Sequence, residues 1–228
     1  MRTKIWGNLE KAKILVIGHD PGLQRSPTIA DYCFFADYYF RFKPSKKSEL
    51  AKYQLAEALF TYIRDLTSGH FSDDELLITN LCNEGLPPSP RGKTVFIPRN
   101  KAEEGLKVIR NLLKGSNIRF IFAMSQQVNY WLQELGFCPA SIRFLEKSEP
   151  KEIGIRNEQP YYEPNKPRAF KEVCGKKYVV EKQYILFPIL HVKSYPLKGN
   201  LLAYEENYKQ CRKEIRELIY SWKARNES

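Results

Sequence analysis

Four short, largely apolar runs separated by segments of helical periodicity constrain most strongly what this 228-residue chain can fold into. The runs cover residues 12–18, 75–81, 118–124 and 184–190. Continuous rather than alternating apolar character is typical of strands buried on both faces of a sheet. Strand followed by helix, repeated along a chain, gives right-handed crossovers and a parallel sheet. We therefore predict a three-layer α/β/α fold with a central, mainly parallel, four-stranded sheet.

Five segments between and after these runs have the spacing or the capping residues of helices. Ser48, Asn100 and Ser125 are suitable N-cap residues, because their side-chain oxygens can accept from the first backbone N–H groups. The predicted helices cover residues 28–40, 48–67, 100–113, 125–136 and 203–224. The last one carries an apolar stripe that we interpret as core packing, formed by Tyr204, Tyr208, Cys211, Ile215, Leu218, Ile219 and Trp222.

Residues 138–182 interrupt this alternation. The stretch is rich in Lys, Arg, Glu, Pro and Tyr, and we interpret it as an irregular insertion with one short strand at residues 177–180. The length of the chain favours one domain, so we predict a single domain over residues 1–228 that contains this insertion.

The chain is strongly basic and has enough apolar residues for a substantial core. Lysine and arginine number 37 against 26 acidic residues, which gives a formal charge of +11. A surplus of this size favours an anionic partner such as nucleic acid, because binding releases counterions from phosphates. The alternative is a surface that is basic without a specific partner. Apolar residues make up 43% of the chain and aromatic residues 13%, which argues against disorder.

The five cysteines are scattered, and no two form a Cys-x-x-Cys pair. This pattern predicts reduced thiols inside a cell, and it argues against a zinc site or an iron–sulfur cluster. We expect no metal and no cofactor. Residues 1–13 are polar and charged, unlike a signal peptide, and no run is long enough to cross a bilayer. We therefore expect a cytoplasmic protein, associated with the nucleoid if the source is bacterial, and no membrane partner.

Polar residues follow three of the four apolar runs directly. They are the stretch Gly18-His19-Asp20-Pro21-Gly22, the pair Thr79-Asn80 and the single residue His191. The carboxyl ends of strands in an open α/β sheet face a crevice where catalytic and binding groups gather. We therefore predict that a carboxylate, an amide and an imidazole meet at one site.

The order of these motifs resembles that of the uracil-DNA glycosylase superfamily. That family has a G-x-D-P motif after its first strand, an asparagine at the end of a middle strand and a histidine after a late strand. Residues 18–22, 76–80 and 186–191 match the three motifs, and the resemblance spans about residues 14–199. It implies the glycosylase fold, in a divergent member for which the cysteine spacing argues against an iron–sulfur cluster. It also implies hydrolysis of the N-glycosidic bond of uracil, or a related damaged or mismatched base, in DNA.

The resemblance gives three residues a role in flipping and releasing the base. Asp20 would support the oxocarbenium-like sugar and position water, or it would merely cap the next helix or form a turn with Pro21. Asn80 would read the base through its donor and acceptor, or it would close a strand-to-loop turn. His191 would donate a hydrogen bond to the departing base, or it would be held by the backbone alone.

The same resemblance assigns a base pocket around the first motif. Gly18, His19 and Gly22 would line it, with Phe34 or Phe35 as the aromatic floor, although core packing is the alternative for any one aromatic residue. The classical uracil-specific branch has tyrosine where Gly22 stands, and that tyrosine blocks the methyl group of thymine. A broader or mismatch-directed substrate range is therefore expected.

The loop after His191 departs from the family motif. In this altered loop, Lys193 and Lys198 would contact phosphates, while Tyr195 or Leu197 would fill the gap left by the flipped base. Ser194 lies between them and is assigned to the same DNA contact. An ordinary basic surface loop is the alternative. The change in the loop is equally consistent with a different substrate or with lost activity.

Two classes of function therefore stay open. The first is a monomeric DNA glycosylase acting on single- or double-stranded DNA that contains a damaged base. The second is a non-catalytic nucleic-acid-binding protein that keeps the glycosylase-like fold. A Rossmann-type nucleotide enzyme is disfavoured, because neither G-x-G-x-x-G nor a P-loop follows the first apolar run.

Overall fold

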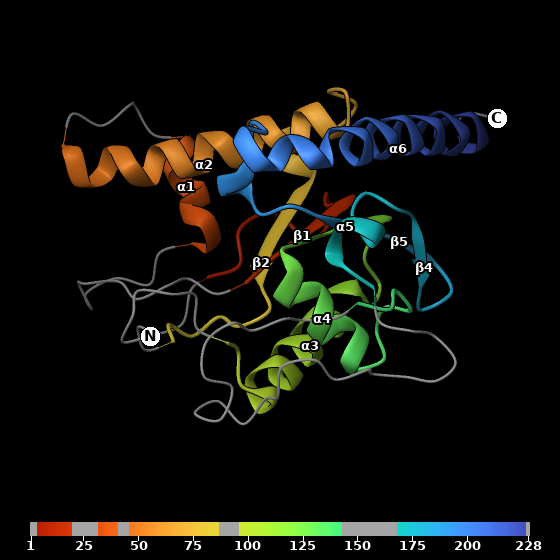
Figure 1. The fold of residues 1–228 in the computed structure, drawn as a ribbon, viewed down its shortest axis with the longest axis horizontal. Coiled ribbons are helices and arrows are strands. Elements are labelled where there is room, and N and C mark those ends of the chain that lie inside the picture. The colour runs from red at the N-terminus through yellow and green to blue at the C-terminus, as the bar shows by residue number, and fades with distance from the viewer. Residues whose placement is uncertain (1–3, 20–31, 41–45, 87–95, 143–167, 227–228) are drawn as a thin grey trace.

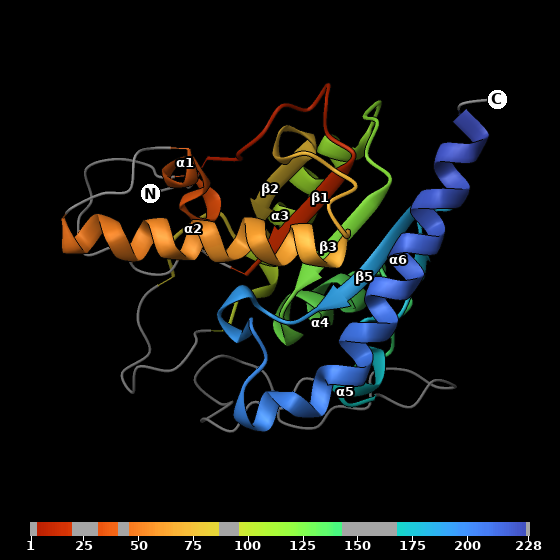
Figure 2. The ribbon, with the colours of Figure 1, turned by 90° about the horizontal axis from the view of Figure 1, so that it is seen from above.

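The computed structural model describes residues 4–19, 32–40, 46–86, 96–142 and 168–226 of the chain. Within them it forms a three-layer α/β arrangement with helices on both faces of a central sheet (Figures 1 and 2). None of the described helices combines the length and the apolar character needed to cross a bilayer.

The sheet has five strands in the order β2-β1-β3-β5-β4 within the described chain. The strands are β1 (Ile14–Gly18), β2 (Leu76–Asn80), β3 (Phe120–Met124), β4 (Tyr178–Val180) and β5 (Tyr184–Ile189). The neighbours β2–β1, β1–β3 and β3–β5 are parallel, as the apolar runs predict, and only β4 is antiparallel to its neighbour.

The prediction of four strands in the sheet is wrong by one. The short strand expected near residues 177–180 pairs with β5 and extends the sheet. The two strands are joined by a tight turn in which Glu181 and Lys182 have φ values of 47° and 63°. Turns of this hand ordinarily use Asn or Gly, so the sequence lacks the usual hairpin signal.

Burial on both sides explains the continuous apolar runs. In β1, Ile14 and Val16 belong to one core cluster, whereas Leu15 and Ile17 belong to the other. All five residues of β1 are buried. A strand in this position has no solvent face, so polar alternation is absent from it.

Helices α2 (Lys47–Leu66) and α6 (Glu205–Asn226) cover one face of the sheet together with the short helix α1 (Ala36–Tyr39). The stripe predicted on the last helix does pack into the core, since Cys211, Ile215 and Ile219 are fully buried there. A 3-10 helix (Gly199–Tyr204) precedes α6, so this α-helix begins two residues later than predicted. Helix α2 begins at Lys47, which makes Ser48 part of the helix rather than its cap.

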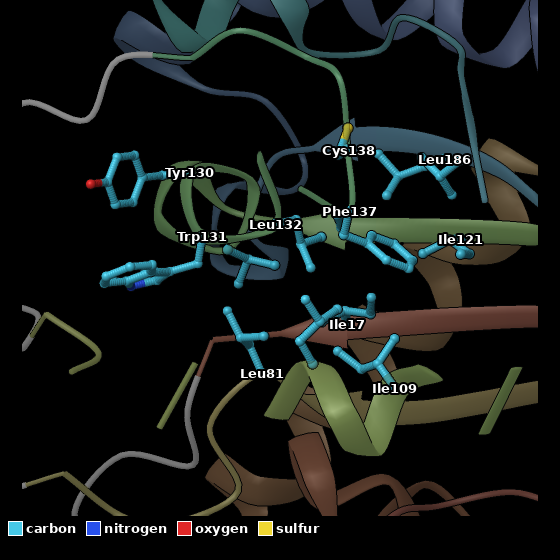
Figure 3. Packing of buried hydrophobic residues seen from close by; sticks show 14 of the residues in the cluster. Ile17, Leu81, Ile109, Ile121, Tyr130, Trp131, Leu132, Phe137, Cys138 and Leu186 are labelled. Atoms are coloured by element: carbon cyan, nitrogen blue, oxygen red, sulfur yellow. The ribbon is translucent and has the colours of Figure 1, made fainter. Parts of the chain in front are cut away.

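Helices α3 (Arg99–Leu113) and α4 (Gln126–Glu134) cover the opposite face. Figure 3 shows Ile17, Ile121 and Leu186 of the sheet directed toward side chains of these helices and of the segment after α4. The Ser125 side chain caps α4 by accepting from the backbone nitrogen of Val128, as predicted. Asn100 is not a cap, because α3 already begins at Arg99.

The described part of the aromatic segment differs from the helix predicted over residues 28–40. It forms a 3-10 helix (Cys33–Phe35) followed by α1, with a kink at Phe34. Residues 28–31 lie outside the described residues. In the predicted insertion, the described residues include the one-turn helix α5 (Phe170–Val173) and strand β4, so that part is not irregular. Residues 143–167 of the insertion are outside the description.

The two edge strands of the sheet, β2 and β4, have different surroundings. Beyond β2, Trp6 exchanges two backbone hydrogen bonds with Ile78, of 3.0 and 2.8 Å. At the other margin lies β4, which is three residues long and has the Val179 side chain 58% exposed.

Candidate functional site

The sheet register brings two of the sequence motifs to the same edge. Gly18 is the last residue of β1 and pairs with Asn80, the last residue of β2. Strand β5 ends in the same direction at Ile189, two residues before His191. We call this end of the sheet, where the parallel strands finish, the carboxyl edge, and we call the opposite end the amino edge.

Asn80 is a buried amide with an unmet hydrogen bond. The residue is only 2% exposed, and its Nδ2 has no hydrogen-bond partner among the described residues. An unsatisfied buried donor costs about 1–3 kcal/mol of folding free energy. Other buried atoms, such as Nε1 of Trp131, also lack a partner. An unpaired atom alone therefore does not identify a functional site. The residues around Asn80 have to supply further evidence.

The ring of Phe34 lies against Asn80 and His191. A Cβ atom built on Gly18 would be 2.3 Å from Cε2 of Phe34 and 2.4 Å from Oδ1 of Asn80, so only glycine fits there. The Phe34 ring centroid is 5.8 Å from that of His191, with the planes tilted by 36°. The structure thus brings Gly18, Phe34, Asn80 and His191 together.

The backbone at Phe34 is strained. Phe34 and Phe35 have φ values of 55° and 54°, in the left-handed region that costs a non-glycine residue about 1 kcal/mol or more. Strain of this kind persists where the surroundings hold it, and it is frequent at functional sites. The Phe35 ring faces α2, where the Lys52 ammonium is 4.9 Å from its centroid. Of the two aromatic candidates, only Phe34 reaches the other site residues.

Asn83 is a residue that the sequence reasoning missed. Its Oδ1 accepts from the backbone nitrogen of Asn80 and from Sγ of Cys33, each at 3.4 Å. It therefore ties the loop after β2 to the segment that carries Phe34. The only signal in the sequence is the second asparagine of Thr79-Asn80-Leu81-Cys82-Asn83.

His19 has a structural setting rather than an open one. It is 6% exposed, and its Nε2 is 2.6 Å from Oε1 of Gln127. The same Oε1 accepts the backbone N–H of Ile97 at 2.6 Å, so it acts as an acceptor and Nε2 of His19 carries the proton. Gln127 thereby joins the loop after β1 to α4 and to the segment before α3. No sequence pattern identified Gln127 beforehand.

The imidazole of His191 is oriented by its own loop. His191 is half-buried and precedes a 3-10 helix (Val192–Ser194), and its Nδ1 accepts the backbone N–H of Lys193 at 3.2 Å. The neutral ring therefore carries its proton on Nε2. In this tautomer the donor of the ring is Nε2, and its role toward a departing base stays a prediction.

The loop that follows splits the predicted DNA contacts. Lys193 and Lys198 are exposed, and Ser194 and Leu197 are half-buried. Tyr195 is turned toward the protein. Its ring stacks on Tyr62 with a centroid distance of 4.7 Å, and its hydroxyl group donates to Asp65 at 3.0 Å. Of the two residues proposed to fill a gap in the duplex, Leu197 is thus the better placed.

Asp20, Pro21 and Gly22 lie outside the described residues. The catalytic carboxylate expected in the first motif is therefore placed only by its position directly after His19. Among the described residues, no group of three or more His, Cys, Asp or Glu side chains could hold a metal ion. All five cysteines are buried free thiols, and burial raises the pKa of Cys138 and of Cys174 to about 12.

No family model matches this chain, and no curated protein sequence matches it.

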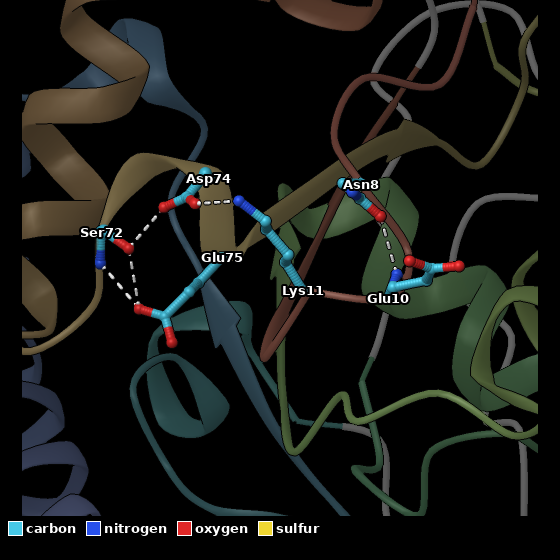
Figure 4. Close-up of polar contacts among 6 residues, drawn as sticks. All are labelled: Asn8, Glu10, Lys11, Ser72, Asp74 and Glu75. Atoms are coloured by element: carbon cyan, nitrogen blue, oxygen red, sulfur yellow. Dashed lines mark hydrogen bonds and ion pairs between the residues drawn. The ribbon is translucent and has the colours of Figure 1, made fainter.

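The amino edge of the sheet offers a useful contrast. A hollow of about 480 Å³ lies there, between the end of α3 and the turn before β5. Two of its charged groups pair, since Arg110 binds Glu181 at 2.8 Å, and the other two, Lys107 and Lys114, are exposed to solvent. Ahead of β1 and β2, Lys11 binds Asp74 at 3.1 Å and Ser72 forms a capping box with Glu75 (Figure 4).

Proposed function

We propose that the protein is a DNA glycosylase that hydrolyses the N-glycosidic bond of uracil or a related damaged or mismatched base. The observation that carries this proposal is the buried, unpaired Nδ2 of Asn80, set beside the ring of Phe34 and within one cluster with His191. The ordered motifs that resemble the uracil-DNA glycosylase superfamily support the same reading.

The amide of Asn80 fits one edge of a pyrimidine. Its Nδ2 can donate to O4 of uracil, and its Oδ1 can accept from N3–H. Cytosine carries an amine at position 4, which would face the Nδ2 donor and leave both groups unpaired. A site that pairs with substrate in this way rejects the wrong base by leaving buried polar groups unmatched.

Phe34 and His191 complete the arrangement around such a base. A base flipped out of the duplex loses its stacking partners, and the Phe34 ring supplies a new one. As the glycosidic bond breaks, negative charge grows on the base, and a donor at Nε2 of His191 stabilises that charge. The surroundings that hold Phe34 in its strained backbone conformation also hold its ring in place before substrate arrives.

Asp20 would act on the sugar side of the bond. A carboxylate is ionised at neutral pH and stabilises the cationic sugar while it positions the attacking water. The reaction consumes water and needs neither a metal nor a cofactor. The surplus of positive charge, including exposed Lys193 and Lys198, favours binding to DNA phosphates. We further propose a cytoplasmic monomer.

The test is release of base from labelled oligonucleotides followed by cleavage with alkali. Single strands and duplexes that contain U·G, U·A or T·G are compared, with the wild type, Asp20→Ala and the control Asp74→Ala. We expect strand cleavage by the wild type and by Asp74→Ala, and a loss of at least about 100-fold in Asp20→Ala.

Two results would overturn the proposal. One is the absence of abasic product from every oligonucleotide, and the other is full activity in Asp20→Ala. Salt-sensitive DNA binding without any base release would instead support the non-catalytic binding protein.

A further inference from the structure

We propose that Asp65 is a positioning residue for His191. It holds the hydroxyl group of Tyr195 and thereby fixes residues 191–195, which we call the His191 loop. The inference rests on the proposed function for what His191 does, whereas the mechanical connection is independent of it.

Asp65 lies in the last turn of α2 and is shared by three segments of the chain. Its Oδ2 accepts the hydroxyl groups of Tyr195, at 3.0 Å, and of Tyr208. Its Oδ1 is 3.2 Å from the guanidinium of Arg212. One carboxylate therefore joins α2, the His191 loop and α6. Hydrogen bonds to an ionised acceptor are roughly twice as strong as those between neutral groups.

The aromatic rings around Asp65 reinforce this connection. Tyr62 stacks on Tyr195 at 4.7 Å, and the Tyr62 and Tyr208 centroids are 6.0 Å apart. Burial, followed by the bond to Asp65, raises the pKa of both Tyr195 and Tyr208. Both phenols therefore stay protonated and keep donating to the carboxylate at physiological pH.

The His191 loop is short and fastened near both of its ends. Val192 is fully buried in the core cluster below α2 and α6. Backbone hydrogen bonds of 2.8 Å from Ser194 to His191 and of 3.0 Å from Tyr195 to Val192 keep the loop tightly turned. A displacement of Tyr195 must therefore move the backbone that orients the imidazole, including the Lys193 N–H that binds Nδ1.

The sharpest single change is Tyr195→Phe, which removes the hydroxyl group and keeps the ring stack. We expect the single-turnover rate of base release to fall about 10-fold, and that of Asp65→Ala to fall about 100-fold, with DNA affinity unchanged. Asp73→Asn is the matched control, because Asp73 pairs with Arg64, the neighbour of Asp65 in α2, rather than with Tyr195 or Tyr208. It should keep the wild-type rate.

A double-mutant cycle separates positioning from a general loss of structure. If Asp65 and Tyr195 act through His191, then Tyr195→Phe will not slow base release further in a His191→Ala background. An equal 10-fold loss in both backgrounds would overturn the inference.

Histidine NMR tests the connection without any activity. The chain has three histidines, and His191→Ala assigns the signal of interest. We expect Tyr195→Phe and Asp65→Ala to shift the His191 ring signals and to leave those of His19 in place. Asp73→Asn should shift neither. Unchanged His191 signals in both Tyr195→Phe and Asp65→Ala would overturn the inference. Shifted signals in a protein that releases no base would count against the proposed function alone.

Discussion

The two edges of the sheet differ in whether their polar groups are satisfied. At the amino edge, Arg110 pairs with Glu181, and the hydroxyl group of Tyr184 donates to the carbonyl of Leu113 at 2.8 Å. At the carboxyl edge, Asn80 is buried with an unpaired nitrogen beside the strained backbone of Phe34. The amino edge has a hollow of about 480 Å³, yet the polar groups named there bind one another, and Lys107 and Lys114 face solvent.

The comparison shows that concavity alone is a poor guide to a binding site. A hollow whose donors and acceptors bind one another or face water gains little from a ligand, because every new hydrogen bond replaces an old one. A buried donor without a partner gains a full hydrogen bond when a complementary group arrives. Unmet hydrogen bonding together with stored backbone strain is the stronger indication of function.

The largest effect should come from Asn80→Leu. We expect base release to fall about 100-fold or more, because the leucine cannot pair with the base. Folding stability should rise by about 1 kcal/mol, because an unsatisfied buried amide is replaced by an apolar side chain of the same branched shape. Urea unfolding and single-turnover base release give the two values.

Tyr184→Phe at the amino edge is the matched control. It should lower stability by about 1 kcal/mol and leave base release unchanged, which is the opposite pattern. If Asn80→Leu lowers stability as Tyr184→Phe does, the contrast between the edges is wrong.

A second pair of variants compares the effect of steric crowding with the effect of backbone strain. Gly18→Ala places a Cβ against Phe34 and Asn80, so we expect a stability loss of about 1–3 kcal/mol and about a 10-fold slower base release. Gly115 lines the amino-edge hollow with φ +69° and open space around it. Gly115→Ala should cost about 1 kcal/mol from strain alone and leave base release unchanged. Equal activity in the two variants would contradict the crowding at Gly18.

Unfolding at alkaline pH tests whether the core behind the carboxyl edge excludes water as fully as the core elsewhere in the protein. The pKa of Cys174, which hydrogen-bonds to the backbone of Leu190, is raised by burial to about 12 from 9.0, and so is that of Cys138 after α4. The raised pKa means that the folded state keeps protons that the unfolded state loses. The resulting stability is complete below pH 9 and is lost as pH rises toward 12.

Unfolding of the wild type, Cys174→Ala and Cys138→Ala at pH 7 and pH 10 measures this contribution. Each thiol should account for about 1.4 kcal/mol of the decline between the two pH values, so each variant should decline less than the wild type. A much smaller share for Cys174 would mean that water reaches the carboxyl edge from below.

The smallest effect is expected from Arg110→Met. The ion pair with Glu181 is about 40% exposed on both sides, so its removal should change stability by less than about 0.5 kcal/mol. Base release should be unchanged. A larger loss of activity would place the amino-edge hollow in the function and so break the comparison.

The parts of the fold that follow from burial were predictable from the sequence. Strands β1, β2, β3 and β5 have no solvent face, so their apolar runs reveal them directly. Strand β4 joins the sheet through a turn at Glu181 and Lys182, whose left-handed backbone is imposed by strand pairing rather than favoured by the residues.

Of the candidate site, only the polar residues at the ends of strands could be predicted from the sequence. Asn80 and His191 stand where strands end, and the parallel register brings such ends together. The contacts of Gln127 with His19 and of Asp65 with Tyr195 join residues more than 100 positions apart. They depend on how helices pack across the sheet, and no local pattern encodes that.

The bridge between Trp6 and Ile78 has a consequence for solubility. Exposed edge strands carry rows of free backbone donors and acceptors that can pair with strands of other molecules and start aggregation. Trp6 occupies the outward-facing N–H and C=O of Ile78 in the middle of β2, and at the opposite margin β4 offers an incoming chain only three residues. A mostly parallel sheet is thereby guarded against growing by addition of foreign strands, and removing the segment that carries Trp6 should expose this hazard on the β2 side first.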